Sequence, residues 1–514
     1  MRKLQFGVIL LVLATISLAG CKKDCKPGED AACWMEALQT PELAEKAVGQ
    51  LKDLNDKKAE PSLVAAFQKA ADQPKLREDI AEIFGKWKTK AAVKPMMDAI
   101  NLTAGPSKDG RKAKATNRAN QKIATALGAI GDMQAADHIR RLMKVTKDPY
   151  VKRSAIRSLG KIKAKDAIDD LLEIMLDKNE KKPLRANAVF ALGEIGDPKV
   201  VSVMVKALYM EKAYFFAHAN LALVKIGEPA VDLLIQTLKG KNKEVKVLLE
   251  SSMGILDGAL EANAAQVLGD IGSNKATEAL LEMVDKVMKW EAETNRLLVL
   301  VRLINALGDV GDKRAIPPIM KVLDSKYWDV RTVIGTALIN IGDRSVVPKL
   351  IEVAGTGTQH PRTRVPMVDA IGNLGTDADL AKLEELKKKH KDRDLTPAVE
   401  KAILRVKAYG ECKQNLNCWI GKLKDKDSSI REKAIYELGR LGDKKAVDPL
   451  MGLLADQNVN VRWALVDAFT KLNSPKPIES IVVLVNVTEK GSTRFKEVNE
   501  KYKRLAARLK RTAK

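Results

Sequence analysis

Histidine, cysteine and aromatic side chains are scarce in this chain of 514 residues. It contains four histidines and five cysteines, and aromatic residues make up 4% of the sequence. The histidines are widely separated, and no H-E-x-x-H, G-x-S-x-G or G-x-x-x-x-G-K-[ST] signature is present. These absences exclude the common zinc-protease, α/β-hydrolase and P-loop sites. We therefore predict a protein that is not an enzyme and that uses no cofactor and no metal.

The first twenty residues have the plan of an export signal. Arg2 and Lys3 precede an apolar run, residues 8–18, that is too short for a comfortable membrane span. Leu-Ala-Gly-Cys at residues 18–21 resembles the lipobox of bacterial lipoproteins. The resemblance implies cleavage after residue 20 and lipidation of Cys21. The alternative is an ordinary signal peptide that happens to precede a cysteine.

A lipidated Cys21 would determine where the protein works. Two or three acyl chains, such as palmitate, anchor a protein stably because each buried CH₂ contributes about 0.8 kcal/mol. In the resembling lipoproteins an aspartate after the cysteine retains the protein in the inner membrane, so Lys22 favours the outer membrane. We expect a lipid-anchored protein on the outer membrane or the periplasmic face, with the cell surface as a further option.

The four remaining cysteines occur in two similar stretches, CKPGEDAACW and CKQNLNCW. An oxidising compartment favours disulfides, and of the three possible pairings the local ones, Cys25–Cys33 and Cys412–Cys418, share the Cys-Trp context. A zinc site would need closer cysteine spacing or nearby histidine, and haem attachment needs C-x-x-C-H. We predict two local disulfides, each stabilising the fold by about 2–2.5 kcal/mol in the chain-entropy model.

Similar segments recur about every thirty residues after residue 33. Examples are KIATALGAIGD (122–132), NAVFALGEIGD (187–197), RLINALGDVGDKRA (302–315) and KAIYELGRLGDKKA (433–446). Apolar residues at i, i+3, i+4 and i+7 predict helices, and no window alternates like a strand. Glycine closing each segment predicts a left-handed helix C-cap before a second amphipathic helix. The chain is therefore predicted to be an all-α, α-α superhelix of about eleven or twelve stacked helix pairs.

The repeats resemble HEAT repeats, in the form named after phycobilisome lyases. In that family a basic residue stands eight positions before the glycine of a Leu-Gly or Ile-Gly pair, and an aspartate in the turn accepts its hydrogen bonds. The matching residues are Arg77, Lys152, Arg185, Arg364 and Arg431, with Arg331 and Arg462 in the same slot before Ile339 and Thr470, and Asp425 and Asp456 as the aspartates. The resemblance implies a HEAT-repeat solenoid in which these ladder residues order stacked turns rather than contact a ligand.

Two enzymatic activities are known in the resembling family. Its deoxyhypusine hydroxylases bind iron through His-Glu pairs, and none of the four histidines here is followed by glutamate. A phycobilin-lyase-like activity remains an alternative, but the repeat by itself does not carry it.

The sequence divides into five segments. They are residues 1–20 (signal peptide), 21–33 (lipidated cysteine and disulfide-capped tether), 34–375 (main solenoid), 376–411 (irregular helical transition) and 412–514 (second disulfide-capped segment with a basic C-terminal helix). The transition is predicted because the repeat loses its register there. The basic tail, residues 492–514, has nine Lys or Arg against two Glu and is predicted to close the end of the array.

The formal net charge of +23 predicts attraction to anionic partners. The function favoured by the repeat and the lipobox is a membrane-anchored scaffold that binds a protein partner through its concave surface. The alternative is a module that binds a polyanion, such as lipopolysaccharide, acidic polysaccharide or extracellular DNA, and anionic lipid contact near the anchor is also expected. Nucleic acid is disfavoured because export removes the protein from cytoplasmic DNA and few aromatic residues are available to stack on bases.

Overall fold

The computed structural model describes residues 25–26, 28, 31–251, 258–291, 293–323, 328–356, 361–487 and 493–512. Cys21 and the signal segment 1–20 lie outside the described residues, so lipidation and cleavage stay predictions. Within the described residues the structure contains α-helices and short 3₁₀-helices and no strand. The all-α fold predicted from the sequence is confirmed, and the described part of the chain contains 29 α-helices, more than eleven or twelve pairs would need.

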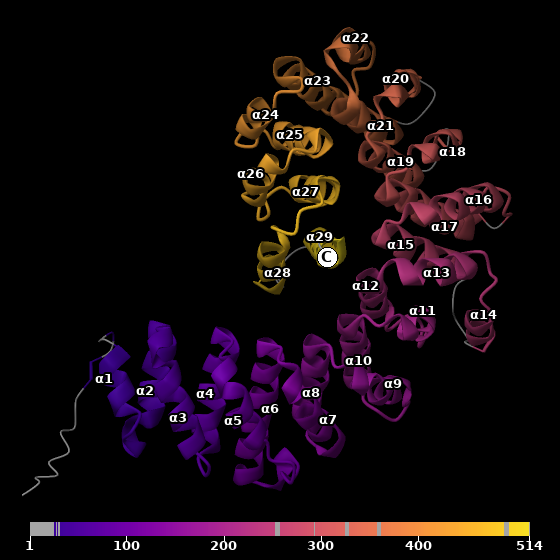
Figure 1. The fold of residues 1–514 in the computed structure, drawn as a ribbon. Helices are drawn as coiled ribbons and strands as arrows, with labels where there is room; N and C mark the ends of the chain where they lie inside the picture. The colour runs from indigo at the N-terminus through magenta and orange to yellow at the C-terminus, as the bar shows by residue number, and fades with distance from the viewer. Residues whose placement is uncertain are drawn as a thin grey trace, which may run out of the picture. The chain divides into compact units, whose positions relative to one another are not determined.

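The helices form two compact units, with the boundary between Ser158 and Leu159. Unit 1 contains the helices α1 (Ala31–Ala37), α2 (Pro41–Leu54), α3 (Glu60–Lys69), α4 (Pro74–Trp87), α5 (Val93–Asp98), α6 (Arg111–Ile130), α7 (Ala136–Val145) and most of α8 (Pro149–Ile162). In this unit α4 packs along α6, α3 packs on α4, and α5 packs on α6 (Figure 1). Unit 1 is therefore a short double layer of paired helices.

Unit 2 has the same two layers over a longer array. The inner helices, which pack successively on one another, are α10 (Lys182–Ile195), α12 (Phe216–Ile226), α15 (Ala259–Ile271), α17 (Glu293–Val310), α19 (Trp328–Ile341), α21 (Pro361–Leu374), α23 (Leu395–Cys412), α25 (Ser428–Leu441), α27 (Val459–Leu472) and α29 (Thr493–Thr512). The outer helices are α9 (Ile168–Leu176), α11 (Val201–Ala207), α13 (Val231–Leu238), α14 (Lys243–Glu250), α16 (Thr277–Val287), α18 (Ile316–Lys321), α20 (Val347–Gly355), α22 (Leu380–Lys389), α24 (Leu416–Lys422), α26 (Val447–Met451) and α28 (Ile478–Val487). The inner row of this unit curves so far that α29 packs against α12 and α15 (Figure 1).

The Gly-Asp turns work as the sequence predicts. Gly131 ends α6 with φ +80°, a left-handed conformation that glycine adopts without steric cost. The carboxylate of Asp132 then accepts a hydrogen bond of 2.9 Å from the backbone N–H of Gln134, which starts the next helix. The same pair of caps recurs after α10, α17, α19 and α25.

The glycine of each Leu-Gly pair has a different role from the C-cap glycine that follows it. Gly308 lies inside α17 and does not cap it, since Gly311 is the C-cap residue. A Cβ atom on Gly308 would lie 2.7 Å from the Cα of Ala337 in α19, too close for any real contact. These glycines therefore let neighbouring inner helices touch backbone to backbone.

Residues 376–411 also contain a helix pair. The helices α22 and α23 pack on each other, and α23 continues the inner row from α21 to α25. The break in the sequence pattern reflects the longer α23, which runs 18 residues against 14 in α21 and α25. The five segment boundaries drawn from the sequence stay a prediction.

Candidate functional site

The predicted ladder residues share one position in the structure. Each is the fourth residue of a 14-residue inner helix: Arg77 in α4, Lys152 in α8, Arg185 in α10, Arg331 in α19, Arg364 in α21, Arg431 in α25 and Arg462 in α27. Three of them, Arg185, Arg331 and Arg364, are at most 3% exposed. Side chains this deeply buried are not available to a partner.

Three ladder arginines cap the helix that precedes them. The Nε of Arg185 donates to the carbonyl oxygen of Met175 at 2.8 Å, and that of Arg364 donates to Ala354 at 2.7 Å. Arg77 makes the corresponding, longer contact of 3.4 Å to Phe67. In each case the acceptor lies ten residues earlier, in the last turn of the paired outer helix, where carbonyl groups lack partners within the helix. The role of these arginines is structural.

The ladder changes its partners near the C-terminus. Arg431 donates to both carboxylate oxygens of Asp456, in the next repeat, at 2.9 and 3.0 Å. Arg462 donates to the backbone carbonyl of the same Asp456. The guanidinium of Arg431 also donates to the backbone oxygen of Asp425 at 2.9 Å. The carboxylate of Asp425 accepts a hydrogen bond from the backbone N–H of Asp427. Asp456 thus links two consecutive repeats of unit 2, whereas the carboxylate of Asp425 orders its own turn.

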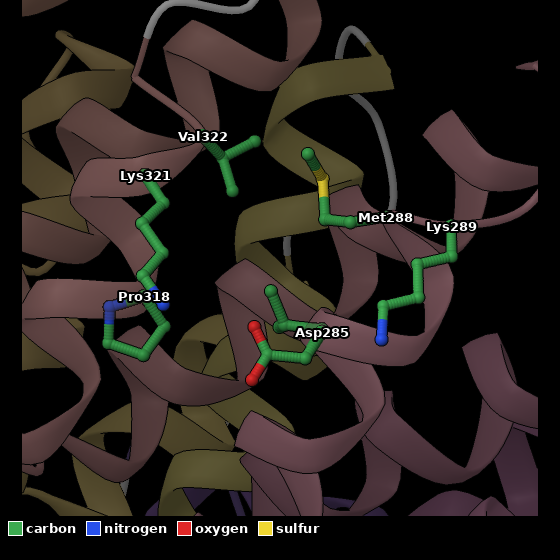
Figure 2. Close-up of a pocket in the computed structure, with 7 residues that line it drawn as sticks. Asp285, Met288, Lys289, Pro318, Lys321 and Val322 are labelled. Atoms are coloured by element: carbon green, nitrogen blue, oxygen red, sulfur yellow. The ribbon is translucent and has the colours of Figure 1, made fainter.

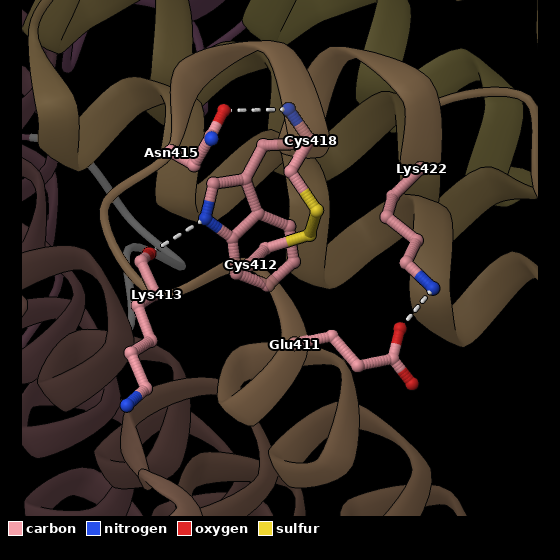
Figure 3. Close-up of a disulfide and its surroundings, with 7 residues drawn as sticks. Glu411, Cys412, Lys413, Asn415, Cys418 and Lys422 are labelled. Carbon is pink, nitrogen blue, oxygen red and sulfur yellow. Dashed lines mark hydrogen bonds and ion pairs between the residues drawn. A yellow bond between two sulfur atoms is a disulfide. The ribbon is translucent and has the colours of Figure 1, made fainter.

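Both cysteine pairs are joined in the structure, with Cα–Cα distances of 5.9 Å for Cys25–Cys33 and 5.4 Å for Cys412–Cys418. Each bridge precedes a buried tryptophan on a seven-residue helix, Trp34 on α1 and Trp419 on α24. In the second stretch the indole Nε1 of Trp419 donates to the carbonyl of Lys413 at 2.8 Å (Figure 3). In the second stretch the bridge therefore fixes the loop whose Lys413 carbonyl binds Trp419.

The inner helices of unit 2 meet one another across the inside of the array. The buried Glu437 on α25 pairs with Arg344, next to α19, at 2.7 Å, and with Lys433 at 3.0 Å. The Nζ of Lys433 also donates to the carbonyl of Asn373, at the end of α21, at 2.6 Å. Burial lowers the pKa of Lys433 to about 8, although Glu437 opposes the shift. Between α19, α21 and α25, part of the inner side that sequence analysis offered to a partner is therefore occupied by contacts within the chain.

Unit 1 presents a different inner surface. Helix α6 and the part of α8 in this unit contain no acidic residue, and their exposed side chains follow one face at helical spacing. We call this surface the basic stripe; its exposed members are Arg111, Lys114 and Arg118 on α6 and Arg153 and Arg157 on α8. Tyr150 is 61% exposed beside them, with the Arg153 guanidinium 5.6 Å from its ring centre. The opposite face of both helices is buried with α7, through Ala124, Leu142 and Val151.

The stripe has geometry suited to an anionic surface. Residues at i, i+3, i+7 along α6, and four apart on α8, hold their charges on neighbouring ridges of one face. Arginine binds carboxylate and phosphate in a fork, and it keeps its charge at every physiological pH. The sequence showed only the net charge, because it does not reveal which basic residues share a face across two helices.

A hollow of about 330 Å³ lies on the outer layer, at the ends of α16 and α18 (Figure 2). Met288, Pro318 and Val322 provide its apolar walls, and Asp285, Lys289 and Lys321 lie at its rim. It is an open recess between two outer helices, and we assign no ligand to it.

Metal ligands do not converge anywhere in the described part of the chain, where no group of three or more His, Cys, Asp or Glu side chains is placed to hold an ion. No helix in the described part of the chain combines the length and the hydropathy of a membrane span.

Family models decide the classification of this repeat array. The model for HEAT repeats matches residues 111–183, 175–254, 316–403 and 419–495, which together are more than half of the chain. The chain belongs to the HEAT-repeat family. A phycobilisome-lyase HEAT-like repeat matches residues 299–325 of this HEAT-repeat protein. No curated protein matches it.

Solved structures share the fold of this HEAT-repeat protein at low sequence identity. Importin beta is 12% identical, with 94% of this chain and 74% of that chain covered and a TM-score of 0.42. The complex of CpcE and CpcF of phycocyanin lyase from Nostoc sp. is 21% identical, covering 60% of this chain and 99% of that chain, with a TM-score of 0.27. Human deoxyhypusine hydroxylase is 18% identical, covering 63% and 99%, with a TM-score of 0.24. At these values the comparison concerns the repeat architecture alone.

Proposed function

We propose that this HEAT-repeat protein is a lipid-anchored scaffold that binds a partner protein with an acidic surface through the basic stripe of unit 1. The observation that carries the proposal is the acid-free, exposed row of arginines and lysines on α6 and α8. The function is non-catalytic. The inner side of unit 2 contributes less to partner binding, because Arg185, Arg364 and Glu437 are already bonded within the chain.

Placement outside the cytoplasm rests on the leader sequence and on Cys21. A chain tethered at Cys21 has unit 1 as its first folded part, so the stripe would operate near the membrane surface, on the outer membrane or the periplasmic face. Basic residues beside an anchor add attraction to anionic headgroups of about 1 kcal/mol each near the surface. An acidic protein partner assembled there would gain from both the anchor and the stripe.

Crosslinking in intact cells, followed by mass spectrometry, tests the proposal. We expect a protein partner to be captured by the wild-type chain and lost from the variant Lys114→Glu/Arg118→Glu/Arg153→Glu. A matched control is Lys388→Glu/Lys389→Glu/Lys391→Glu, which makes the same charge change at the exposed basic cluster of unit 2. Equal capture by the stripe variant and the control would contradict the proposal.

A polyanion is the second candidate for the same stripe. The exposed Tyr150 with Arg153 over its ring favours it, since planar guanidinium and phenol groups together contact sugar or base faces. Binding of heparin or polyphosphate to the wild-type chain, with a steep decrease as salt rises and no protein captured in cells, would support the polyanion over the protein partner.

A further inference from the structure

Helix α29 joins the end of unit 2 to its beginning. It packs on its neighbours α27 and α28, and it also contacts α12 and α15, more than two hundred residues earlier in the chain (Figure 1). The sequence predicts only that this basic helix closes the end of the array. The structure adds a second set of contacts that a simple terminal cap would not need.

The two sets of contacts use two different faces of α29. Val498, Tyr502, Leu505 and Leu509 are at most 3% exposed and belong to the apolar core shared with α25 and α27. The face turned toward α12, α15 and α17 is basic, with Lys501, Arg504, Arg508 and Arg511 at helical spacing. Lys503 and Lys510, on the remaining side, are exposed.

The first basic contact is with buried acid. Asp270, on α15, has a side chain only 2% exposed and lies 3.3 Å from Lys501 and 3.0 Å from Arg504. Asn220 on α12 donates to its other carboxylate oxygen at 2.9 Å. Lys501 also pairs with Asp309 on α17. A carboxylate buried to this degree requires cationic partners, and α29 supplies two of them.

The second contact is with the ends of three inner helices. Arg511 donates to the carbonyl oxygens of Val224 at 2.6 Å and Ile271 at 2.9 Å, and Arg508 approaches those of Asp309 and Gly272 at 3.5 Å. These carbonyls lie in or next to the last turns of α12, α15 and α17, where the helix dipoles are negative and carbonyls lack partners within the helix.

The C-cap glycines shape the same place. A Cβ on Gly227, after α12, would lie 2.4 Å from Cδ of Arg511, and one on Gly272, after α15, would lie 2.1 Å from Nη1 of Arg508. A side chain at either turn would therefore displace the tip of the arginine from the position it takes here. We call the surface made by Asp270, Asp309 and the three helix ends the acidic receptor.

We propose that the acidic receptor is a binding site for a lysine- and arginine-rich helix of a partner protein, and that α29 occupies it in cis until such a helix takes its place. The buried carboxylate of Asp270, the helix-end carbonyl groups that accept from Arg508 and Arg511, and the space beside two glycines fit a helix that carries arginine and lysine. This site lies in unit 2 and is independent of the lipid anchor and of the basic stripe.

The test uses the full chain with its basic face reversed, Lys501→Glu/Arg504→Glu, which keeps the apolar face of α29. The matched control is Lys503→Glu/Lys510→Glu, with the same change of charge on the exposed side. The probe is a fluorescent peptide of residues 493–512, followed by anisotropy, with amide hydrogen exchange of α12 and α15 as a second readout. We expect faster exchange at the ends of α12 and α15 in the reversed variant, and binding of the peptide to it at least roughly tenfold tighter than to wild type or control, because only there do Asp270 and Asp309 lose the charges of Lys501 and Arg504.

Specificity is tested by adding Asp270→Asn/Asp309→Asn to the reversed variant, which should abolish the gain in peptide affinity. Unchanged exchange in the reversed variant would show that the basic face does not hold α29 and would overturn the cis contact. Faster exchange without peptide binding, or peptide binding that persists after both aspartates are replaced, would overturn the receptor. Dimerisation of the wild-type chain through exchanged α29 helices would contradict occupancy in cis.

Discussion

Replacing Gly128 by alanine is expected to destabilise unit 1, although the same change at an open helical site stabilises. In an exposed helix interior alanine is better than glycine by about 0.8–1 kcal/mol. Gly49, in α2, is such a site, because it is exposed and a Cβ there would meet no atom within 4 Å. A Cβ on Gly128 would lie 2.6 Å from Cβ and 2.8 Å from Cα of Ser158 in α8.

The magnitude follows from those contacts. Because Cα of Ser158 is a backbone atom, relief requires a shift of α8, and overpacking of this kind costs about 1–3 kcal/mol. After the gain in helix propensity is subtracted, we expect Gly128→Ala to lower the free energy of unfolding by up to about 2 kcal/mol. Gly49→Ala should raise it by up to about 1 kcal/mol.

Urea unfolding followed by circular dichroism measures the free energy of unfolding of the two variants. Because a repeat array can unfold in parts, amide hydrogen exchange of α6 and α8 shows where the effect lies. Opposite signs for the two variants would support close backbone packing of the inner helices. If Gly128→Ala stabilised the chain as much as Gly49→Ala, the packing argument would be wrong.

Three further outcomes are expected. Arg364→Ala should lower the free energy of unfolding by about 1.5–3 kcal/mol, because it removes a charged donor from the carbonyl of Ala354. Lys388→Ala, at an exposed site, should change the free energy of unfolding by less than about 0.5 kcal/mol. Equal effects of the two variants in chemical denaturation would refute the capping role of Arg364. The pKa of Lys433 is lowered to about 8 in the folded chain, below the unfolded value of about 10.4, so its burial costs most below pH 8 and the free energy of unfolding should rise with pH between those two values. Glu437 and Arg344 face the amine, and Lys433→Met should remove the rise. An identical pH profile of stability for both chains would exclude the lysine as the source of the rise. Peptide mapping without reductant should recover Cys25 linked to Cys33 and Cys412 linked to Cys418, and free thiols at the second pair would contradict the bridge.

The local features of the fold were readable from the sequence because they depend on a few adjacent residues. The Gly-Asp turns have fixed backbone chemistry, and a basic residue every repeat at one helical position indicates a ladder. The role of Gly128 was not readable, because the sequence does not show that Ser158 lies against it. Lys433 and Glu437 look like an ordinary exposed pair four residues apart, and only the curvature of the array buries them.

The contacts of α29 show the same limit on a larger scale. The prediction that this basic tail closes the end of the array agrees with the burial of Tyr502 and Leu505. Nothing near Lys501 in the sequence points to Asp270, 231 residues earlier. The basic stripe needed the structure for a similar reason, since it is assembled from α6 and α8, which α7 separates in the sequence.

The most direct measurement of the central claim is amide hydrogen exchange of the full chain with and without its crosslink-identified partner. The account predicts protection on the exposed stripe helices, at residues 111–125 and 150–157, with no change around α22. Protection confined to the inner helices of unit 2, with the stripe unchanged, would contradict it.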